Sequence, residues 1–396
     1  MIRTIMPPDR TAPKARASVA ALSVAPIVSY ADRFGYLPVT TAIAAQTRVA
    51  PTAIIASVTA YLVAYGACQP VWGALSDRFG RRTVLLGGLL GLAAVDLAVA
   101  LVPGAVALVG LRAAAGAMSG ALLPTTLAAV GDAVEPAERH HVVSRLVAAA
   151  SLGAAVAMLL GGLIAARFGS GTAMSLLSLS ALVGAVIVAR AVPHSAEPTH
   201  STAESVRELW RVRRPAGRLY AFAFIEGVVM LGAFPLIVPA LRAQGQTAAG
   251  TGVTMAAYGI AAVAGAASIR RLQTRAPARP VQVGGLLLVA GLAVATAIPV
   301  APLPLAALTS GALGAAFSLF HARFQVMATQ LAPRARGLGT GMFVGMVFTG
   351  AAAGTALGSS LATRAGYPTA FAATAALAVL VTAAGHHLTR TASASA

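Results

Sequence analysis

The sequence predicts an all-α membrane protein with twelve transmembrane helices in two pseudo-symmetric halves of six helices each. The first observation is composition: the 396 residues have a mean hydropathy of +0.80, and only 10% of them are charged. Such a chain is typical of a protein that resides in a lipid bilayer. The second observation is an internal repeat, because the chain resembles itself when it is shifted by 197 residues.

Apolar stretches of sufficient length occur throughout the chain. About 20 residues at a helical rise of about 1.5 Å cross a hydrocarbon core of about 30 Å. The twelve predicted spans are 17–43, 52–72, 83–103, 105–130, 142–166, 171–192, 218–241, 249–269, 281–300, 303–326, 337–362 and 367–388. The predicted organisation is an N-terminal tail (1–16), a first six-helix half (17–192), a polar linker (193–217), a second six-helix half (218–388) and a C-terminal tail (389–396).

The positions of the basic residues predict the orientation. Of the 29 Lys and Arg residues, 23 lie at the termini, in the linker, in alternate loops or in the last few span residues next to these segments. Cytoplasmic loops carry an excess of Lys and Arg, so these segments and both termini are expected on the cytoplasmic side. We therefore predict a multi-pass protein of the cytoplasmic (inner) membrane.

The internal repeat is carried mainly by glycine, proline and arginine residues near helix ends. The shift of 197 residues aligns, among other pairs, Gly35 with Gly232, Tyr61 with Tyr258, Gly153 with Gly350, Pro136 with Pro333 and Gly169 with Gly366. Two halves arranged in parallel account for these matches. A basic start followed by an apolar run also fits a signal peptide cleaved near 42–44, but the repeat requires this segment to be retained.

Sequence features exclude several classes of chemistry. Cys68 is the single cysteine, so no internal disulfide forms, and the adjacent His140 and His141 are interpreted as solvated residues rather than metal ligands. Lys14, the only lysine, is followed by alanine, so there is no GK[ST] phosphate loop, and no G-x-S-x-G elbow occurs. We therefore expect no enzyme activity, cofactor, metal or nucleic-acid partner. We expect instead that the protein's work is driven by a gradient.

The segment "GALSDRFGRRTVLL" at 73–86 resembles the signature G-x-L-x-D-R-x-G-R-R/K of the major facilitator superfamily. The matching residues are Gly73, Asp77, Arg78, Gly80, Arg81 and Arg82. Together with "YLPVTTAIAAQ" and "YLVAYGACQPVW", this segment is most similar to the 12-helix drug:proton antiporter branch. The family motif R-x-x-x-G of the fourth helix is present as Arg112 and Gly116, with Ala115 where the family usually has glutamine.

The resemblance implies a conformational latch between the halves. In the family, the acid of the signature pairs with an arginine at the start of the eleventh helix, near an acid at the end of the fourth helix; these positions are Asp77, Arg336 and Asp132 here. Gly73 and Gly80 are expected to let the loop pack closely against helix ends, with Arg81 and Arg82 on the cytoplasmic side. The alternative is a topological anchor without a switching role.

Charged residues inside the predicted spans are candidates for function, because a charge at the bilayer centre costs at least about 2.5–3.5 kcal/mol. Counting along the helices places Asp32, Asp96 and Arg112 at one depth. The resemblance implies that Asp32 and Arg112 face each other across the cavity. Arg33, about 100° further round its helix, is expected to pair with Asp96 or to extend outward.

Asp32 is the candidate proton carrier, exchanging a proton for a cationic or polar substrate; the alternative is a purely architectural bridge to Arg112. Glu226 is its candidate counterpart in the second half. His321 is interpreted as a packing residue near the membrane interface. The alternatives for the whole protein are an importer on the same scaffold and a membrane sensor that does not transport.

Small residues predict where helices approach one another. The candidate packing positions are Gly116, Gly153, Gly161, Gly162, Gly350, Gly354 and Gly358. The antiporter branch carries G-x-x-x-G-P-x-x-G-G on its fifth helix, whereas this chain has Ala157 and Met158 in place of the Gly-Pro pair. That departure counts against export. The expected partners are a small-molecule substrate, protons and the lipid bilayer, and the expected state is a monomer.

Overall fold

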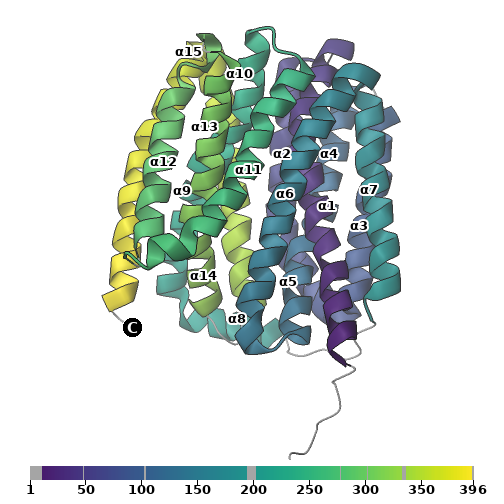
Figure 1. Ribbon diagram of the computed structural model, residues 1–396, viewed down its shortest axis with the longest axis vertical. Coiled ribbons are helices and arrows are strands. Elements are labelled where there is room, and N and C mark those ends of the chain that lie inside the picture. Colours follow the sequence, from purple (N-terminus) through teal and green to yellow (C-terminus); the bar gives the residue numbers. More distant parts are fainter. Residues whose placement is uncertain are drawn as a thin grey trace, which may run out of the picture.

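The computed structural model describes residues 11–47, 49–101, 104–193, 202–276, 278–300, 302–331 and 336–394, and within these ranges it contains helices and short connections but no strand. The elements are α1 (Thr11–Gln46), α2 (Pro51–Phe79), α3 (Arg81–Leu101), α4 (Ala105–Ser119), α5 (Leu122–Ala133), α6 (Pro136–Phe168), α7 (Ser170–Ala191), α8 (Thr202–Arg211), α9 (Arg213–Ala233), η1 (Phe234–Leu236), α10 (Ile237–Ala243), α11 (Ala248–Gln273), α12 (Arg279–Ala295), η2 (Ile298–Val300), α13 (Leu303–Ala316), the π-helical η3 (Phe317–His321), α14 (Ala322–Leu331) and α15 (Arg336–Ala394). Figure 1 shows them as a bundle of roughly parallel rods.

Many of these helices have the length and composition of membrane spans. Nine in the described ranges are long and apolar enough to cross a membrane, and α12 is apolar but shorter. One of the nine, Leu338–Arg390, contains 53 residues. At Gly366 the backbone has φ 83°, so two helices meet there inside α15. The protein is therefore an all-helical, multi-pass membrane protein.

The helices pack in two groups that follow the order of the chain. In the first group, α1 packs against α6 and α7, α2 against α4, and α3 against α7. In the second group, α9 packs against α15, α11 against α13, and α12 against α13 and α15. Figure 1 shows the first group in purple and blue on one side and the second in green and yellow on the other. The groups meet where α6 contacts α11 and α2 contacts α15.

Small residues set the closest helix contacts in each group. A methyl group on Gly35 of α1 would lie 3.0 Å from the Cβ of Ala157 on α6. A methyl group on Gly232 of α9 would lie 2.8 Å from the Cα of Gly354 on α15. Adding 197 to the residue numbers of the first contact gives those of the second. The repeat found in the sequence thus corresponds to equivalent helix crossings in the two groups.

The signature segment departs from the expected loop. Helix α2 continues to Phe79 and α3 begins at Arg81, so the connection is a single residue, Gly80, with φ 85°. Only glycine adopts this left-handed conformation without strain. The linker likewise differs from a simple polar connection, because it contains α8, and α9 begins at Arg213, before the predicted start at 218.

Candidate functional site

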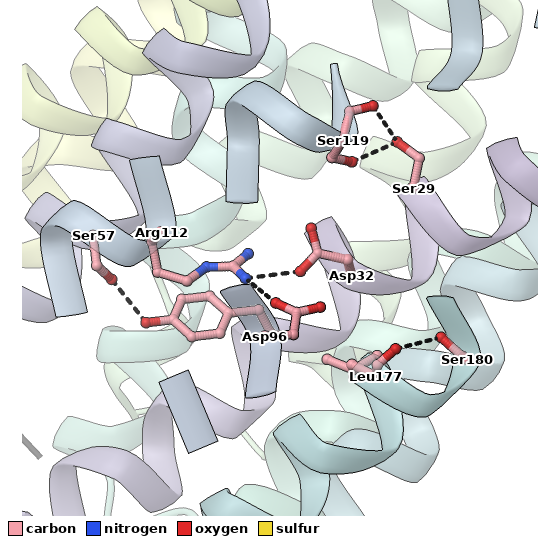
Figure 2. A network of polar contacts seen from close by, with 9 residues as sticks. Ser29, Asp32, Ser57, Asp96, Arg112, Ser119, Leu177 and Ser180 are labelled. Atoms are coloured by element: carbon pink, nitrogen blue, oxygen red, sulfur yellow. Dashed lines mark hydrogen bonds and ion pairs between the residues drawn. The ribbon is translucent and has the colours of Figure 1, made fainter. Parts of the chain in front are cut away.

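Three charged side chains meet inside the first helix group. The Arg112 Nη1 atom donates hydrogen bonds to Asp32 Oδ1 at 2.7 Å and to Asp96 Oδ1 at 3.2 Å, as Figure 2 shows. The side chains come from α4, α1 and α3, and each of the three residues is at most 1% exposed. We call Asp32, Asp96 and Arg112 the triad.

Aromatic rings fix the position of the Arg112 guanidinium. Its Cζ lies 4.0 Å from the ring centroid of Tyr36 and 4.6 Å from that of Tyr61. The hydroxyls of Tyr36 and Ser57 share a hydrogen bond of 2.8 Å, which orients the Tyr36 ring. Cation–π contacts of this kind strengthen when water is excluded, so the guanidinium is held by two carboxylates and two rings.

The charges of the triad do not cancel. Two ionised carboxylates and one guanidinium leave one negative charge, whereas a single added proton makes the triad neutral. The second carboxylate oxygens, Asp32 Oδ2 and Asp96 Oδ2, are buried and have no hydrogen-bond partner among the described residues. Buried polar atoms are usually satisfied, so these two oxygens are suitable acceptors for a proton.

Arg33 does not pair with Asp96, contrary to one sequence expectation. Asp96 contacts Arg112 instead, and the Arg33 guanidinium lies among the rings of four aromatic residues. Its Cζ is 4.5 Å from the Tyr30 centroid, 4.5 Å from Phe34, 5.2 Å from Tyr65 and 4.9 Å from Phe348. Nor does Arg33 extend outward, because it is only 8% exposed. Consecutive residues differ by about 100° around a helix, which separates Arg33 from the triad.

The second helix group contains a buried acid–histidine pair. Glu226 Oε1 lies 3.2 Å from His321 Nδ1, and the two residues are 1% and 7% exposed. The His321 ring stacks on Phe317 with a centroid separation of 4.7 Å. His321 is therefore a buried partner of Glu226, a contact that the sequence did not predict; its position near the membrane interface stays a prediction. It ends the π-helical turn η3, a distortion that is frequent at functional sites.

A small cavity of about 30 Å³ lies between the two helix groups. This volume holds no more than a few water molecules, so the centre of the protein is closed. Its lining residues are Arg33, Phe34, Tyr36, Leu37, Val58, Tyr61, Leu62, Arg112, Leu231, Phe234, Pro235 and Phe348. Both groups thus contribute walls to one central cavity next to the triad.

The predicted latch can be described only in part. Arg81 Nε donates to Asp132 Oδ2 at 3.0 Å, and Arg81 Nη1 donates to Ser76 Oγ at 2.9 Å. The side chains of Asp77 and Arg336 lie outside the described part of the chain, as do those of Lys14, His140 and His141. Asp132 therefore forms an ion pair with Arg81, a residue of the signature segment.

Other signature residues also have defined positions. Arg82 donates to the carbonyl of Ala189 on α7, and Arg78 lies over the ring of Phe79 at 5.3 Å. No described atom lies within 4 Å of a methyl group placed on Gly73. The expected close packing at Gly73 is therefore not found among the described residues.

The other predicted packing glycines all lie at close helix contacts. A methyl group would meet Tyr61 at Gly116, Ile27 at Gly153, Gly35 at Gly161, Ala248 at Gly162, Phe224 at Gly350, Val228 at Gly354 and Leu236 at Gly358. The contact at Gly162 joins α6 to α11 and so connects the two groups. The contacts at Gly153 and Gly350 again correspond under the shift of 197 residues.

The sequence reasoning missed His321 and the tyrosines around the two arginines. The predicted span ended at 326, whereas α14 continues to Leu331. The contact of His321 with Glu226 joins two helices far apart in the sequence, so spacing along the chain did not reveal it. Tyr61 stood out only as a match of the internal repeat, and nothing in the sequence marked Tyr36 or Tyr61 as a neighbour of Arg112.

Comparison with known proteins establishes the family. The model of the Major Facilitator Superfamily matches residues 22–268, more than half of the chain. The chain belongs to the major facilitator superfamily. A solved bacterial homologue of the human lysosomal transporter Spinster, in an inward-facing and unoccupied conformation, superposes with a TM-score of 0.75 at 14% identity and covers 96% of this chain and 98% of that one. This likeness supports the fold.

Curated relatives match shorter regions of this superfamily member. A triacylglyceride transporter of Mycobacteroides abscessus is 39% identical over 143 residues, which are 36% of this chain and 28% of the relative. A chloramphenicol resistance protein of Pseudomonas aeruginosa is 30% identical over 210 residues, 52% of this chain and 50% of the relative. The chain thus spans half or less of the length of these two relatives.

Proposed function

We propose that this protein is a proton-coupled secondary transporter that exports a small drug-like or metabolite molecule by alternating access. The observation that carries the proposal is the triad, in which two buried carboxylates share one guanidinium nitrogen. An acid within the membrane is by default a candidate for a proton pathway.

The triad supplies a proton site with two states. Without a bound proton it carries one negative charge, and with a proton it is neutral. Asp32 forms the shorter contact with Arg112 and belongs to α1, which also contributes Arg33 to the central cavity. A proton taken up from outside and released inside would then alternate with movement of substrate in the opposite direction.

The proposed architecture is twelve spans in two repeats with both termini in the cytoplasm. The equivalent contacts at Gly35 and Gly232 support two halves related by the 197-residue shift. The turns at Gly169 and Gly366, with φ 93° and 83°, also correspond under this shift. Counting α1, α12 and the two parts of α15 separately brings the spans to the proposed number.

Alternating access requires that the closed centre opens to one side at a time. The cavity of about 30 Å³ is too small for an organic molecule, so the halves must rock apart. We assign the latch that holds one state to Asp77, Arg336 and Asp132, with the Arg81–Asp132 contact at the same end of the bundle.

The names of the curated relatives favour export over import. A chloramphenicol resistance protein and the multidrug efflux pump LfrA of Mycolicibacterium smegmatis are among the matches, and removal of toxic compounds from the cell accounts for such names. The substrate is expected to be small and partly apolar, and the location is the inner membrane. The working unit is a monomer.

The experiment expresses the full chain in a bacterial host that lacks its own drug exporters. Growth is compared across a panel of compounds that includes chloramphenicol, with and without an agent that collapses the proton gradient. The wild-type protein should raise tolerance to at least one compound only while the gradient exists, and Asp32→Asn should abolish this effect. Arg167→Gln, at an exposed site, is the matched control and should behave as wild type. Gradient-dependent tolerance that survives Asp32→Asn would remove Asp32 from the coupling mechanism.

A further inference from the structure

Arg33 is a buried cation whose charge the triad does not use. Asp32 and Asp96 both bind Arg112, and no carboxylate of the described part forms a salt bridge with Arg33. The Arg33 Nε atom is buried and lacks a hydrogen-bond partner there. An ionised group in this position is costly unless a counter-charge joins it.

The aromatic rings around Arg33 stabilise its charge but supply no counter-charge. Four rings lie within 5.2 Å of Cζ, and the face of a ring attracts a cation without accepting its N–H groups in the way a carboxylate does. A guanidinium presents a planar fork of donors that matches a carboxylate or phosphate. Arg33 therefore lacks an oxyanion partner among the described residues.

The central cavity is also lined by cationic and aromatic side chains. Among the described residues, its lining contains two cationic side chains, Arg33 and Arg112, and five aromatic ones, but no acidic one. Leu231 and Phe348 come from the second helix group and Arg33 from the first, so a molecule bound here contacts both groups. Once the halves move apart and enlarge it, a cavity with this lining favours an anion with an apolar body.

We propose that Arg33 binds the anionic group of the transported substrate, which makes the cargo an organic anion whose apolar or aromatic body lies against the surrounding rings. This inference rests on the proposed transport function and specifies its substrate class. The competing explanation is that Arg33 only joins α1, α2 and α15 through its contacts with Tyr65 and Phe348.

Binding is measured by calorimetry on the full chain in lipid nanodiscs with three probes of similar shape: 2-naphthoate, 2-naphthamide and 2-naphthylmethylammonium. The wild-type protein should bind the carboxylate about tenfold or more tightly than the neutral or cationic probe, the scale of one charge-assisted contact. Arg33→Gln should remove this preference while leaving the naphthamide affinity within about threefold, because the apolar contacts remain. Arg33→Lys should keep part of the preference, since it retains the charge without the fork. Arg167→Gln, the same change at an exposed site, should have no effect.

Equal affinity for the three probes in the wild-type protein, or a preference for the cation, would overturn the proposal whether or not the variants fold. A parallel loss of all three affinities in Arg33→Gln would leave Arg33 as a structural contact only. Flux of 2-naphthoate into proteoliposomes separates the two proposals. Arg33-dependent binding without flux would support the anion site and contradict transport of this probe, whereas flux that survives Arg33→Gln unchanged would overturn the site.

Discussion

Asparagine substitutions at Asp32 and Asp96 test whether the two carboxylates share the Arg112 guanidinium. Both acids contact the same atom, Nη1, at 2.7 and 3.2 Å. Coulomb attraction falls with the inverse of distance, so the two contacts differ in strength by a factor of only about 1.2. Either acid alone is therefore expected to balance the charge of Arg112.

The single and double variants should differ sharply in stability. Asp32→Asn or Asp96→Asn keeps one ion pair and removes the excess negative charge, so each should change the free energy of unfolding by less than about 1.5 kcal/mol. The double variant buries the Arg112 guanidinium without a carboxylate and should lose about 3–5 kcal/mol. If each single variant loses about 1 kcal/mol, the coupling energy between the two sites is about 1–3 kcal/mol.

The assay is equilibrium unfolding of the purified protein in mixed micelles, followed by circular dichroism. The control combines Asp32→Asn with Asp132→Asn, a site that pairs with Arg81 instead of Arg112, and its losses should add. Simple addition of the losses in the Asp32/Asp96 double variant would refute the shared guanidinium. A single substitution as damaging as the double would show that one acid alone carries the interaction.

Three further predictions concern packing, the second buried pair and the latch. Gly350→Ala should lower the free energy of unfolding by about 1–3 kcal/mol, because the added methyl group meets a backbone carbonyl of α9. The control Gly87→Ala, at a site with no described atom within 4 Å of the added methyl group, should not change it. Equal effects of the two substitutions in mixed-micelle unfolding would argue against the close contact. Glu226→Leu should lower the free energy of unfolding by about 1–3 kcal/mol, because it leaves His321 without its partner. Glu226→Gln can still form a hydrogen bond and should lower it by less than about 1 kcal/mol. Similar losses of stability in the two variants would show that the pair contributes nothing. Asp77→Asn should leave membrane insertion intact and cut efflux severely in the tolerance assay, and wild-type efflux would reduce the signature to a topological anchor.

The sequence was sufficient for properties that sum or repeat along the chain. Hydropathy accumulates over every residue, so the membrane class follows from composition alone. The 197-residue repeat predicted equivalent contacts, and the structure has them at Gly35 with Ala157 and at Gly232 with Gly354. Depth in the bilayer is also additive, because each helical residue advances by about 1.5 Å. This counting placed Asp32, Asp96 and Arg112 at one level before any contact was known.

Tertiary structure decided which of these groups meet. From the sequence, Arg112 was expected to face Asp32, and Arg33 to pair with Asp96 or extend outward. In the structure the rotation of α1 turns Arg33 towards aromatic rings, and Asp96 contacts Arg112 instead. Rotation about a helix axis is set by packing with neighbouring helices, which sequence spacing does not encode. His321, at the end of η3, likewise meets Glu226 of α9 only in the folded bundle. The chain sequence therefore determined the membrane class, the repeat and the depth of its buried charges, while the azimuth of each helix, fixed only when all helices pack together, decided their partners.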